Sequence, residues 1–280
     1  MSQPTSPPAF TKPAVLIDRV REVIRDRQNR RRMAESNYWN ERVQSRTGHA
    51  RSVWHAEHFS DAWHARQVRL LRDAIDELLG GAHNIDALDV GCGTGRITLE
   101  LQLMGARTVG VDFSDATVKV ASEEAQAMGA DVRYVVGDIA QPPLPLEDAS
   151  FDAVVAVGCL AVACRGIDEL EASMREMRRL VRPRGAVILL EPIHTTRLLG
   201  RVLKAPAHEW ITAAEHAGLR LMKHDGMGFV PTRLALSSFD LPPWFVRPVF
   251  AMGERTLERV PSRRLADYTL LGFHRADRES

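Results

Sequence analysis

The chain has 280 residues, 45% of them hydrophobic, which is enough to bury one large core with appended segments. Lysine and arginine total 37 against 36 aspartate and glutamate, and the formal net charge of +1 excludes a chain that is strongly acidic or basic overall. No stretch approaches about 18 continuous apolar residues, and no basic segment with an apolar core opens the chain. We therefore expect neither a membrane span nor a secretory signal.

The first 80 residues differ in composition from the rest. Residues 1–13 are rich in proline and serine, and we predict a disordered tail there. Residues 14–80 read as an N-terminal helical extension, or lid, and begin with a predicted helix over 14–35 that carries seven arginines between Arg19 and Arg32. A solvated helix face explains such a cluster, and attraction to nucleic acid, an anionic membrane or an acidic substrate remains open.

Three glycines at alternate positions follow an apolar strand in residues 87–95. The strand carries Asp89 near its end, and Gly91, Gly93 and Gly95 come next. Glycine tolerates unusual backbone angles and lets a ligand lie against the backbone. A helical pattern opens at Ile97, so the glycines form a strand-to-helix turn where open α/β sheets bind ligands. The third glycine comes one position too early for a dinucleotide site, and the lysine of a P-loop is absent.

Acidic residues also follow the next two predicted strands. Asp112 ends the strand at 108–111, close to the distance of about 20 residues expected for a ribose-binding acid. Asp138 and Ile139 follow the strand at 132–137. Residues 151–157 read as a strand buried on both faces, and a helix over 169–181 and a strand over 186–190 come after it.

This order of turn and strand ends resembles the class I methyltransferases that depend on S-adenosylmethionine (SAM), over about residues 85–192. The resemblance implies a Rossmann-like doubly wound α/β fold, with a seven-stranded sheet whose last strand is antiparallel. It implies SAM as cofactor and S-adenosylhomocysteine (SAH) as its product. It places a methyltransferase domain at 81–280 with a cap insertion at 230–265. It assigns cofactor contacts to Asp89, Gly91, Gly93, Gly95, Asp112, Phe113, Asp138, Ile139 and Val157.

The sequence indicates less about the methyl acceptor than about the cofactor. Members of the family that act on adenine or glutamine carry an Asn/Asp-Pro-Pro-Tyr/Phe motif after the fourth strand, whereas residues 157–162 read VGCLAV. This apolar segment indicates either a hydrophobic acceptor or a buried loop. His194 is the first candidate base because histidine titrates near neutrality, and Glu191 is the next. His208 and Glu209 are weaker candidates. Resemblance to quinone- and lipid-precursor methyltransferases suggests four aromatic residues for the acceptor pocket, with core packing as the alternative: Tyr38, Trp54, Trp63 and Trp244.

We therefore expect a cytoplasmic enzyme that methylates a small, lipophilic acceptor, at oxygen. The alternatives are a methyltransferase acting on RNA or another nucleic acid, and a SAM-binding regulator or assembly partner without chemistry. Nucleic acid is not the partner we expect, whereas Trp244 and Phe245 suggest contact with a membrane surface. The three cysteines, at positions 92, 159 and 164, lack metal-ligand spacing and predict no metal.

Overall fold

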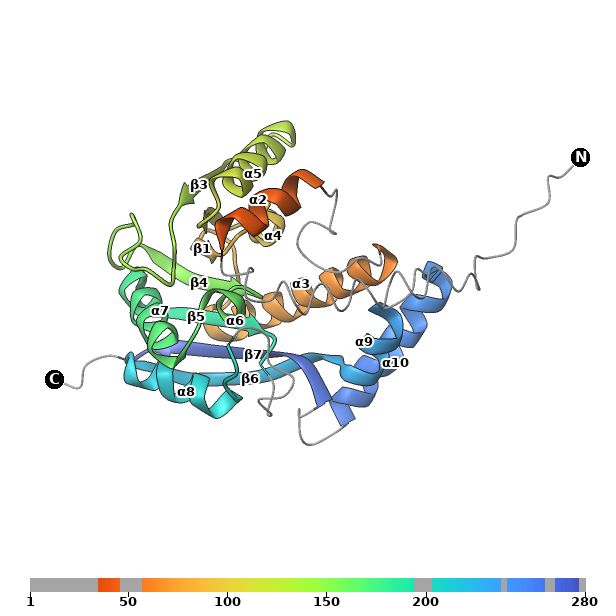
Figure 1. Cartoon of the computed structure of the whole chain (residues 1–280). Helices are drawn as coiled ribbons and strands as arrows, with labels where there is room; N and C mark the ends of the chain where they lie inside the picture. The colour runs from red at the N-terminus through yellow and green to blue at the C-terminus, as the bar shows by residue number, and fades with distance from the viewer. Residues whose placement is uncertain (1–34, 46–56, 194–202, 238–240, 260–264, 277–280) are drawn as a thin grey trace, which may run out of the picture.

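The computed structural model describes residues 35–45, 57–193, 203–237, 241–259 and 265–276. These residues form a seven-stranded sheet with helices on both faces (Figure 1). The strands are β1 Asp86–Val90, β2 Arg107–Asp112, β3 Val132–Val136, β4 Phe151–Val157, β5 Val181–Glu191, β6 Leu219–Phe229 and β7 Ala266–Arg275, in the spatial order β3-β2-β1-β4-β5-β7-β6. β7 runs antiparallel to both of its neighbours. The predicted Rossmann-like sheet with an antiparallel last strand is confirmed.

Nine described helices connect and cover the strands. They are α2 Ser36–Ser45, α3 Glu57–Leu79, α4 Arg96–Leu103, α5 Asp115–Ala127, α6 Leu160–Ala163, α7 Ile167–Leu180, α8 Ala207–His216, α9 Val230–Ser237 and α10 Pro243–Arg259. α2 and α3 fall within the predicted N-terminal extension, and α9 and α10 within the predicted cap. The predicted tail and the arginine-rich helix over 14–35 lie outside the described residues, and the domain boundaries stay predictions.

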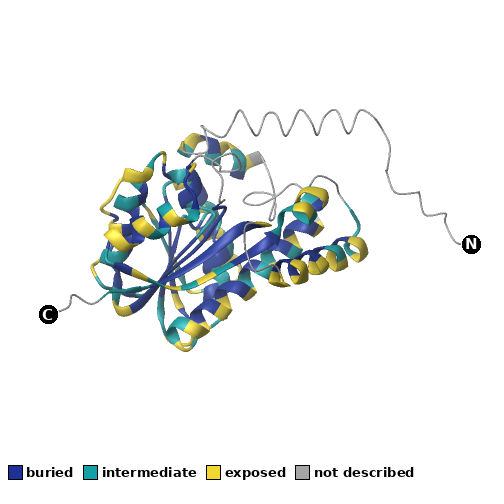
Figure 2. Cartoon of the chain, turned by 90° about the horizontal axis from the view of Figure 1, so that it is seen from below, coloured by how far each residue is buried: buried dark blue, intermediate teal, exposed yellow. Residues whose placement is uncertain are grey.

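The central strands bury side chains on both faces. Along β4, Val154 and Ala156 pack into a core that includes residues of α7 and α8, whereas Ala153 and Val155 pack into a second core with α3 and α4. Successive side chains of a strand point to opposite faces, so a run of apolar residues suits a strand covered on both sides. Figure 2 shows this arrangement, with dark blue strands between helices whose outer surfaces are exposed.

The glycine turn and the helices α9 and α10 lie at the same edge of the sheet. β1 to β5 are parallel, and β6 is parallel to β5 because both pair antiparallel with β7. The end of β6 at Phe229 and the two helices that follow it therefore lie at the carboxyl edge of the parallel strands. β6 pairs with β7 along its length as far as Phe229.

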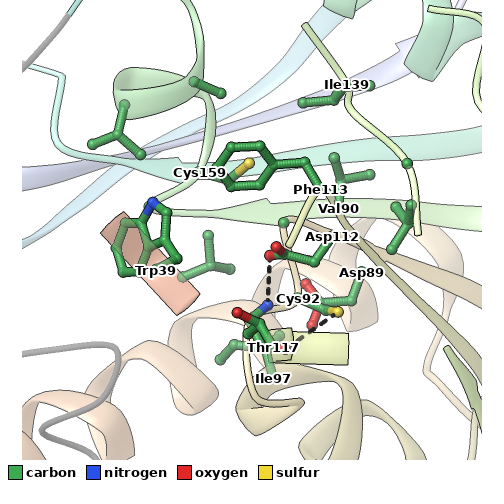
Figure 3. Close-up of a pocket in the computed structure, with 18 of the residues that line it drawn as sticks. Trp39, Asp89, Val90, Cys92, Ile97, Asp112, Phe113, Thr117, Ile139 and Cys159 are labelled. Atoms are coloured by element: carbon green, nitrogen blue, oxygen red, sulfur yellow. Dashed lines mark hydrogen bonds between the residues drawn. The ribbon is translucent and has the colours of Figure 1, made fainter. Parts of the chain in front are cut away.

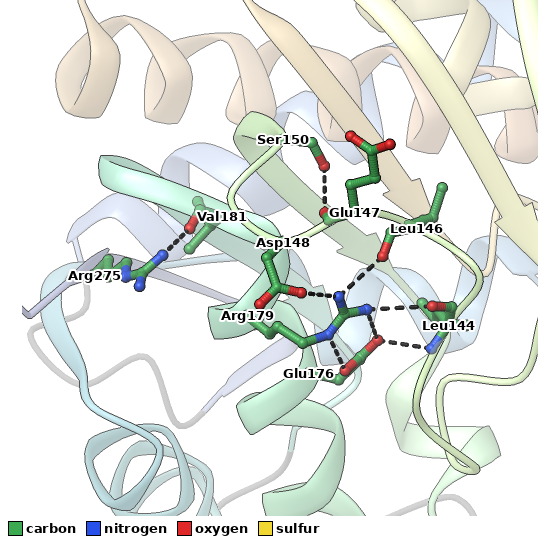
Figure 4. Close-up of polar contacts among 9 residues, drawn as sticks. All are labelled: Leu144, Leu146, Glu147, Asp148, Ser150, Glu176, Arg179, Val181 and Arg275. Carbon is green, nitrogen blue, oxygen red and sulfur yellow. Dashed lines mark hydrogen bonds and ion pairs between the residues drawn. The ribbon is translucent and has the colours of Figure 1, made fainter.

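The connection between β3 and β4 is held against α7 by an arginine network (Figure 4). The Arg179 guanidinium contacts the carboxylates of Glu176 and Asp148, and it donates to the carbonyl oxygens of Leu146 at 2.9 Å and Leu144 at 3.2 Å. Glu176 also accepts from the Leu144 amide at 2.7 Å. The hydrogen bond to Glu176 raises the pKa of Arg179 above its ordinary value. This network fixes a connection that begins just after β3 with Asp138 and Ile139, which are among the predicted cofactor contacts.

Candidate active site

A pocket opens at the carboxyl ends of β1, β2 and β4 (Figure 3). It holds about 880 Å³ of space, open solvent included. The order of strands reverses here, since β1 lies between β2 and β4. The lining comes from residues 89–93, 96–97, 111–113, 137–139, 157–159 and 162–163, with Trp39 and Thr117. Eight of the nine predicted cofactor residues lie in these ranges, and Gly95 does not.

Two glycines of the turn are required for different reasons. Gly91 has a φ of +68°, and a Cβ there would lie 2.2 Å from the sulfur of Cys159. Gly93 has a φ of +56°, and a Cβ there would meet nothing within 4 Å. The chain itself therefore leaves the space beside Gly93 open, as close approach of a ligand requires. Gly95 instead packs on the hydroxyl end of Tyr134, away from the pocket.

The carboxylate of Asp112 lies buried at the end of β2 and faces the pocket. One of its oxygens accepts from the Gly93 amide at 3.0 Å, and the other accepts from the Ser114 amide at 3.0 Å. A carboxylate oxygen has two acceptor positions, so each oxygen can accept one more hydrogen bond. Burial raises the pKa of Asp112 to about 6. This geometry suits a ligand with two adjacent hydroxyl groups.

Asp89 and Arg96 form the charged floor of the pocket. Asp89 accepts from the Thr98 hydroxyl at 2.7 Å, and burial raises its pKa to about 7. Arg96 is the one basic side chain among the described lining residues, and burial lowers its pKa to about 10. It contacts His64, and its Nε is buried without a hydrogen-bond partner among the described residues. Arg96 was not among the predicted site residues, although it is the basic residue directly after the glycine turn.

Asp138 and Ile139 line the opposite side of the pocket. The Asp138 carboxylate accepts from the Ala140 amide at 2.9 Å and from the Gln141 side chain at 2.8 Å, which holds the turn after β3. The carbonyl of Ile139 accepts from the Ser173 hydroxyl at 3.0 Å. These contacts fix the backbone of both residues at the pocket wall.

Helix α2 brings an aromatic side chain to the pocket. Asn40 accepts a hydrogen bond of 2.6 Å from the hydroxyl of Ser114, the residue that caps α5, and this contact docks α2 on α5. Trp39 lines the pocket, whereas Tyr38 is buried edge-on to Trp39 with ring centroids 5.2 Å apart. Tyr38, rather than Trp39, was predicted from the sequence, and the position of Trp39 beside Tyr38 was the signal that could have identified it.

Two other predicted acceptor residues, Trp63 and Trp244, do not line this pocket. Trp63 is fully buried against Phe59, Phe250 and Tyr268 in the core beneath α3. Trp244 lies on α10 and is 75% exposed. Trp54 and the candidate base His194 lie outside the described residues.

Glu191 is fully buried at the end of β5 and is bonded to backbone amides. Its carboxylate accepts from the amides of Cys159 at 2.8 Å, Leu160 at 3.0 Å and Ala161 at 3.2 Å. The bonds hold the start of α6, which contributes to the pocket wall. His208 is exposed and Glu209 is half-buried at the start of α8, and neither lines the pocket.

Cysteine and metal chemistry receive no support from the described geometry. Burial raises the pKa of Cys92 and of Cys159 well above the ordinary thiol value, so neither is poised as a thiolate nucleophile. Across the described ranges, no group of three histidine, cysteine or acidic side chains is placed to hold a metal ion. None of the helices in these ranges has both the length and the apolar character needed to cross a membrane.

A family model described as a methyltransferase domain matches residues 88–189, from β1 to β5. The matched range spans the glycine turn, Asp112, Asp138 and the wall after β4. The chain carries a class I SAM-dependent methyltransferase domain. The matched region contains most of β1 to β5 and every pocket-lining residue except Trp39, whereas α2, α3, α8 to α10, β6 and β7 lie outside it.

Relatives and solved structures agree with this domain. The chain is similar to demethylmenaquinone methyltransferase of Staphylococcus aureus, 32% identical over 46% of this chain and 52% of that protein. It is 30% identical to the sterol 4-C-methyltransferase strm-1 of Caenorhabditis elegans, over 46% of this chain and 37% of that protein. The match thus spans about half or less of each relative. Magnesium protoporphyrin IX methyltransferase of Synechocystis PCC 6803 shares the fold, with a TM-score of 0.57 and 16% identity over 89% of this chain and 97% of that chain.

Proposed function

We propose that the protein transfers a methyl group from SAM to a small, lipophilic acceptor. The observation that carries this proposal is the pairing of Asp112 with Gly93. Asp112 keeps two acceptor positions at the pocket, and the missing side chain of Gly93 leaves the adjoining space open. Similarity to methyltransferases over residues 88–189 supports the same assignment.

The described residues fit the parts of SAM. In this proposal Asp112 accepts both ribose hydroxyls, Asp138 accepts from the adenine amine, and the Ile139 amide and side chain hold the ring. Arg96 pairs with the carboxylate of the methionine portion. When bound, SAM supplies a methyl group activated by its sulfonium sulfur. The protein contributes mainly position, because methyl transfer requires the acceptor in line with the methyl group.

The role of Arg96 has a test that uses two ligands. SAH carries the carboxylate, whereas 5′-methylthioadenosine lacks the whole amino-acid portion. A hydrogen bond between charged groups contributes about 1.5–3 kcal/mol, so Arg96→Gln is expected to raise the Kd of SAH at least about tenfold. The Kd of methylthioadenosine should stay within about twofold of the wild-type value. Equal weakening of both ligands, or no weakening of SAH, would overturn the assignment.

The acceptor side of the pocket supports a lipophilic substrate. Its described wall carries Val157, Val162 and Ala163, with Trp39 on the side of α2. Glu191 holds α6 through three backbone bonds, so we assign it the positioning of this wall rather than proton removal. His194 remains our candidate for the base.

The acceptor atom is the finer part of the proposal. The sequence-based prediction of oxygen stands beside a nematode relative named for transfer to carbon. Incubation with methyl-labelled SAM and separated lipid, aqueous and RNA fractions of the host decides the acceptor class. Alkaline hydrolysis then releases the label as methanol from a methyl ester, hydriodic acid releases it as methyl iodide from a methyl ether, and neither releases it from a methyl group on carbon. We expect label in the lipid fraction. Label confined to RNA would support the nucleic-acid alternative, and SAM binding without label in any fraction would support the regulator.

A further inference from the structure

The outer surface of α10 combines apolar and basic side chains. Trp244 is 75% exposed, Phe245 41% and Met252 59%. Among the large hydrophobic side chains that the described ranges expose, the two aromatic ones are Trp244 and Phe245. Three exposed arginines accompany them on the same helix. We define the interfacial face as Trp244, Phe245, Arg247, Met252, Arg255 and Arg259.

These six residues share one side of the helix. At about 100° per residue they fall within about 160° of the helix circumference, and from Trp244 to Arg259 they extend for about 22 Å. The opposite side packs into the core through Val246, Phe250 and Leu257, all of which are buried. The interfacial face is therefore left to solvent by the fold, and its residues are not needed to hold α10 in place.

Polar contacts hold α10 rigidly on its inner side. The buried carboxylate of Glu254 accepts from Arg66 of α3 at 2.9 Å and from the Gly228 amide of β6 at 2.8 Å. Glu258 lies 3.6 Å from the same arginine. These are the two carboxylates of α9 and α10, and both are directed to Arg66. Glu258 is nevertheless 62% exposed and falls within the arc of the interfacial face, so three arginines and one carboxylate lie there and the outward charge is positive.

The interfacial face also lies near the edge of the sheet at which the pocket opens. α10 follows β6, whose end lies at the carboxyl edge of the parallel strands, and the pocket opens at that edge. Figure 1 shows α9 and α10 beyond the ends of β6 and β7. A surface that engages this face therefore lies on the side of the molecule at which ligands enter.

We propose that the interfacial face docks on the surface of a bilayer containing anionic phospholipids. Exposed tryptophan and phenylalanine insert at the boundary between headgroups and acyl chains, and arginines pair with lipid phosphates. Charge complementarity selects this occupant, since three outward arginines alternate with apolar side chains. A nucleic acid would pair with the arginines and stack a base on Trp244, but it would gain little from Met252. Membrane docking is measured without turnover, so it stands or falls separately from methyl transfer.

The test is co-sedimentation of the full chain with lipid vesicles. Vesicles of phosphatidylcholine alone are compared with vesicles containing one third phosphatidylglycerol, and each basic residue near an anionic surface contributes about a kcal/mol, or severalfold in binding. We expect partitioning at least about tenfold stronger to the anionic vesicles, lost at high salt. Reversal of the interfacial arginines should lower it at least about tenfold: Arg247→Glu, Arg255→Glu and Arg259→Glu.

Two further variants separate the interfacial face from overall charge. A matched reversal of three exposed arginines elsewhere should stay within about twofold of wild type: Arg133→Glu, Arg165→Glu and Arg220→Glu. Trp244→Ser with Phe245→Ser leaves the charge unchanged and should still weaken partitioning severalfold. Each variant is checked by its thermal unfolding midpoint, and glutamine replaces glutamate if a reversal lowers that midpoint.

Four results would overturn the proposal. They are equal binding to both kinds of vesicle, binding to neither, an equal loss in the matched control, or no effect of the double serine variant. In parallel, retention of labelled RNA that depends on the interfacial arginines, without vesicle binding, would assign the face to nucleic acid. A dimer in solution that the double serine variant converts to monomer, without vesicle binding, would assign it to a second copy of the chain.

Discussion

Replacing Asp112 by asparagine tests the ribose assignment with little change in shape. Both carboxylate oxygens of Asp112 accept a backbone amide and retain one further acceptor position. Asparagine has a single oxygen, and its amino group cannot accept from a hydroxyl. At least one ribose hydroxyl therefore loses its partner, together with the charge that strengthened the bond. A hydrogen bond to a charged group contributes about 1.5–3 kcal/mol, so the Kd of SAH should rise at least about tenfold.

The pKa of Asp112 adds a second signature. Burial raises this pKa to about 6, so only about a tenth of the unliganded protein carries the ionised carboxylate at pH 5. If the ionised form accepts the ribose, wild-type affinity for SAH falls about tenfold between pH 7.5 and pH 5. Asp112→Asn lacks the titrating group and should lose this part of the pH dependence. The Asp112 charge is one of the causes that raise the pKa of Asp89, so the ratio of the two Kd values reports the titration of Asp112 together with its effect on Asp89.

Isothermal titration calorimetry with SAH at both pH values measures the two effects. Asp131→Asn is the matched control, because Asp131 is exposed just before β3 and does not line the pocket. It should bind SAH as the wild type does. The reasoning is refuted if Asp112→Asn binds within about twofold of wild type at pH 7.5, or if its affinity follows pH as steeply as that of the wild type.

Three further predictions concern the turn, the arginine network and the buried acid of β1. Gly93→Ala and Gly129→Ala both place a Cβ in open space at a positive φ, so each should cost about 1 kcal/mol of stability. Only Gly93→Ala should weaken SAH binding, at least about tenfold by calorimetry. Equal SAH binding by the two variants would contradict the proposal that the space beside Gly93 holds the cofactor. Arg179→Ala leaves the buried carboxylate of Glu176 without its cation and should lower the free energy of unfolding in urea by about 2 kcal/mol or more. Arg175→Ala breaks an exposed ion pair on the same helix and should lower it by under about 0.5 kcal/mol. Similar losses of stability in the two variants would refute the role of the Arg179 network. The pKa of Asp89 is about 7 when folded, above its ordinary 3.8, so the stability it contributes is present at low pH and lost as pH rises through 7. Between pH 5 and pH 8 without ligand, the free energy of unfolding of Asp89→Asn should therefore rise by about 2–3 kcal/mol relative to that of the wild type. A difference in unfolding free energy between the two proteins that is the same at both pH values, measured in urea, would contradict this.

Much of the fold and the cofactor pocket could be predicted because its signals are local. Each parallel strand is recognisable in the sequence as a short apolar run, and the residue types at its carboxyl end are those suited to binding a ligand. Asp112 is the last residue of β2 and Asp138 lies two residues after β3, and parallel strands bring such ends to one edge. The positions of these residues at the pocket follow from topology alone.

The missed residues depend on contacts between distant segments. Trp39 reaches the pocket because Asn40 bonds to Ser114, which lies 74 residues further along the chain. Glu191 lies beside the pocket, but its carboxylate is bonded to amides about 30 residues earlier, which nothing in its own neighbourhood indicates. Tryptophan identity also does not reveal orientation. Trp63 faces the core and Trp244 faces solvent, because the packing partners of α3 and α10 decide which face of each helix is buried.

Competition for bound, labelled SAM tests the central claim most directly. The protein is equilibrated with labelled SAM, and SAH, NAD⁺ and ATP are added in turn as competitors. The pocket geometry predicts one bound SAM per chain, displaced by SAH but by neither NAD⁺ nor ATP, and lost in Gly93→Ala. Displacement by NAD⁺, or SAM binding that survives unchanged in Gly93→Ala, would contradict the assignment of the glycine turn to SAM.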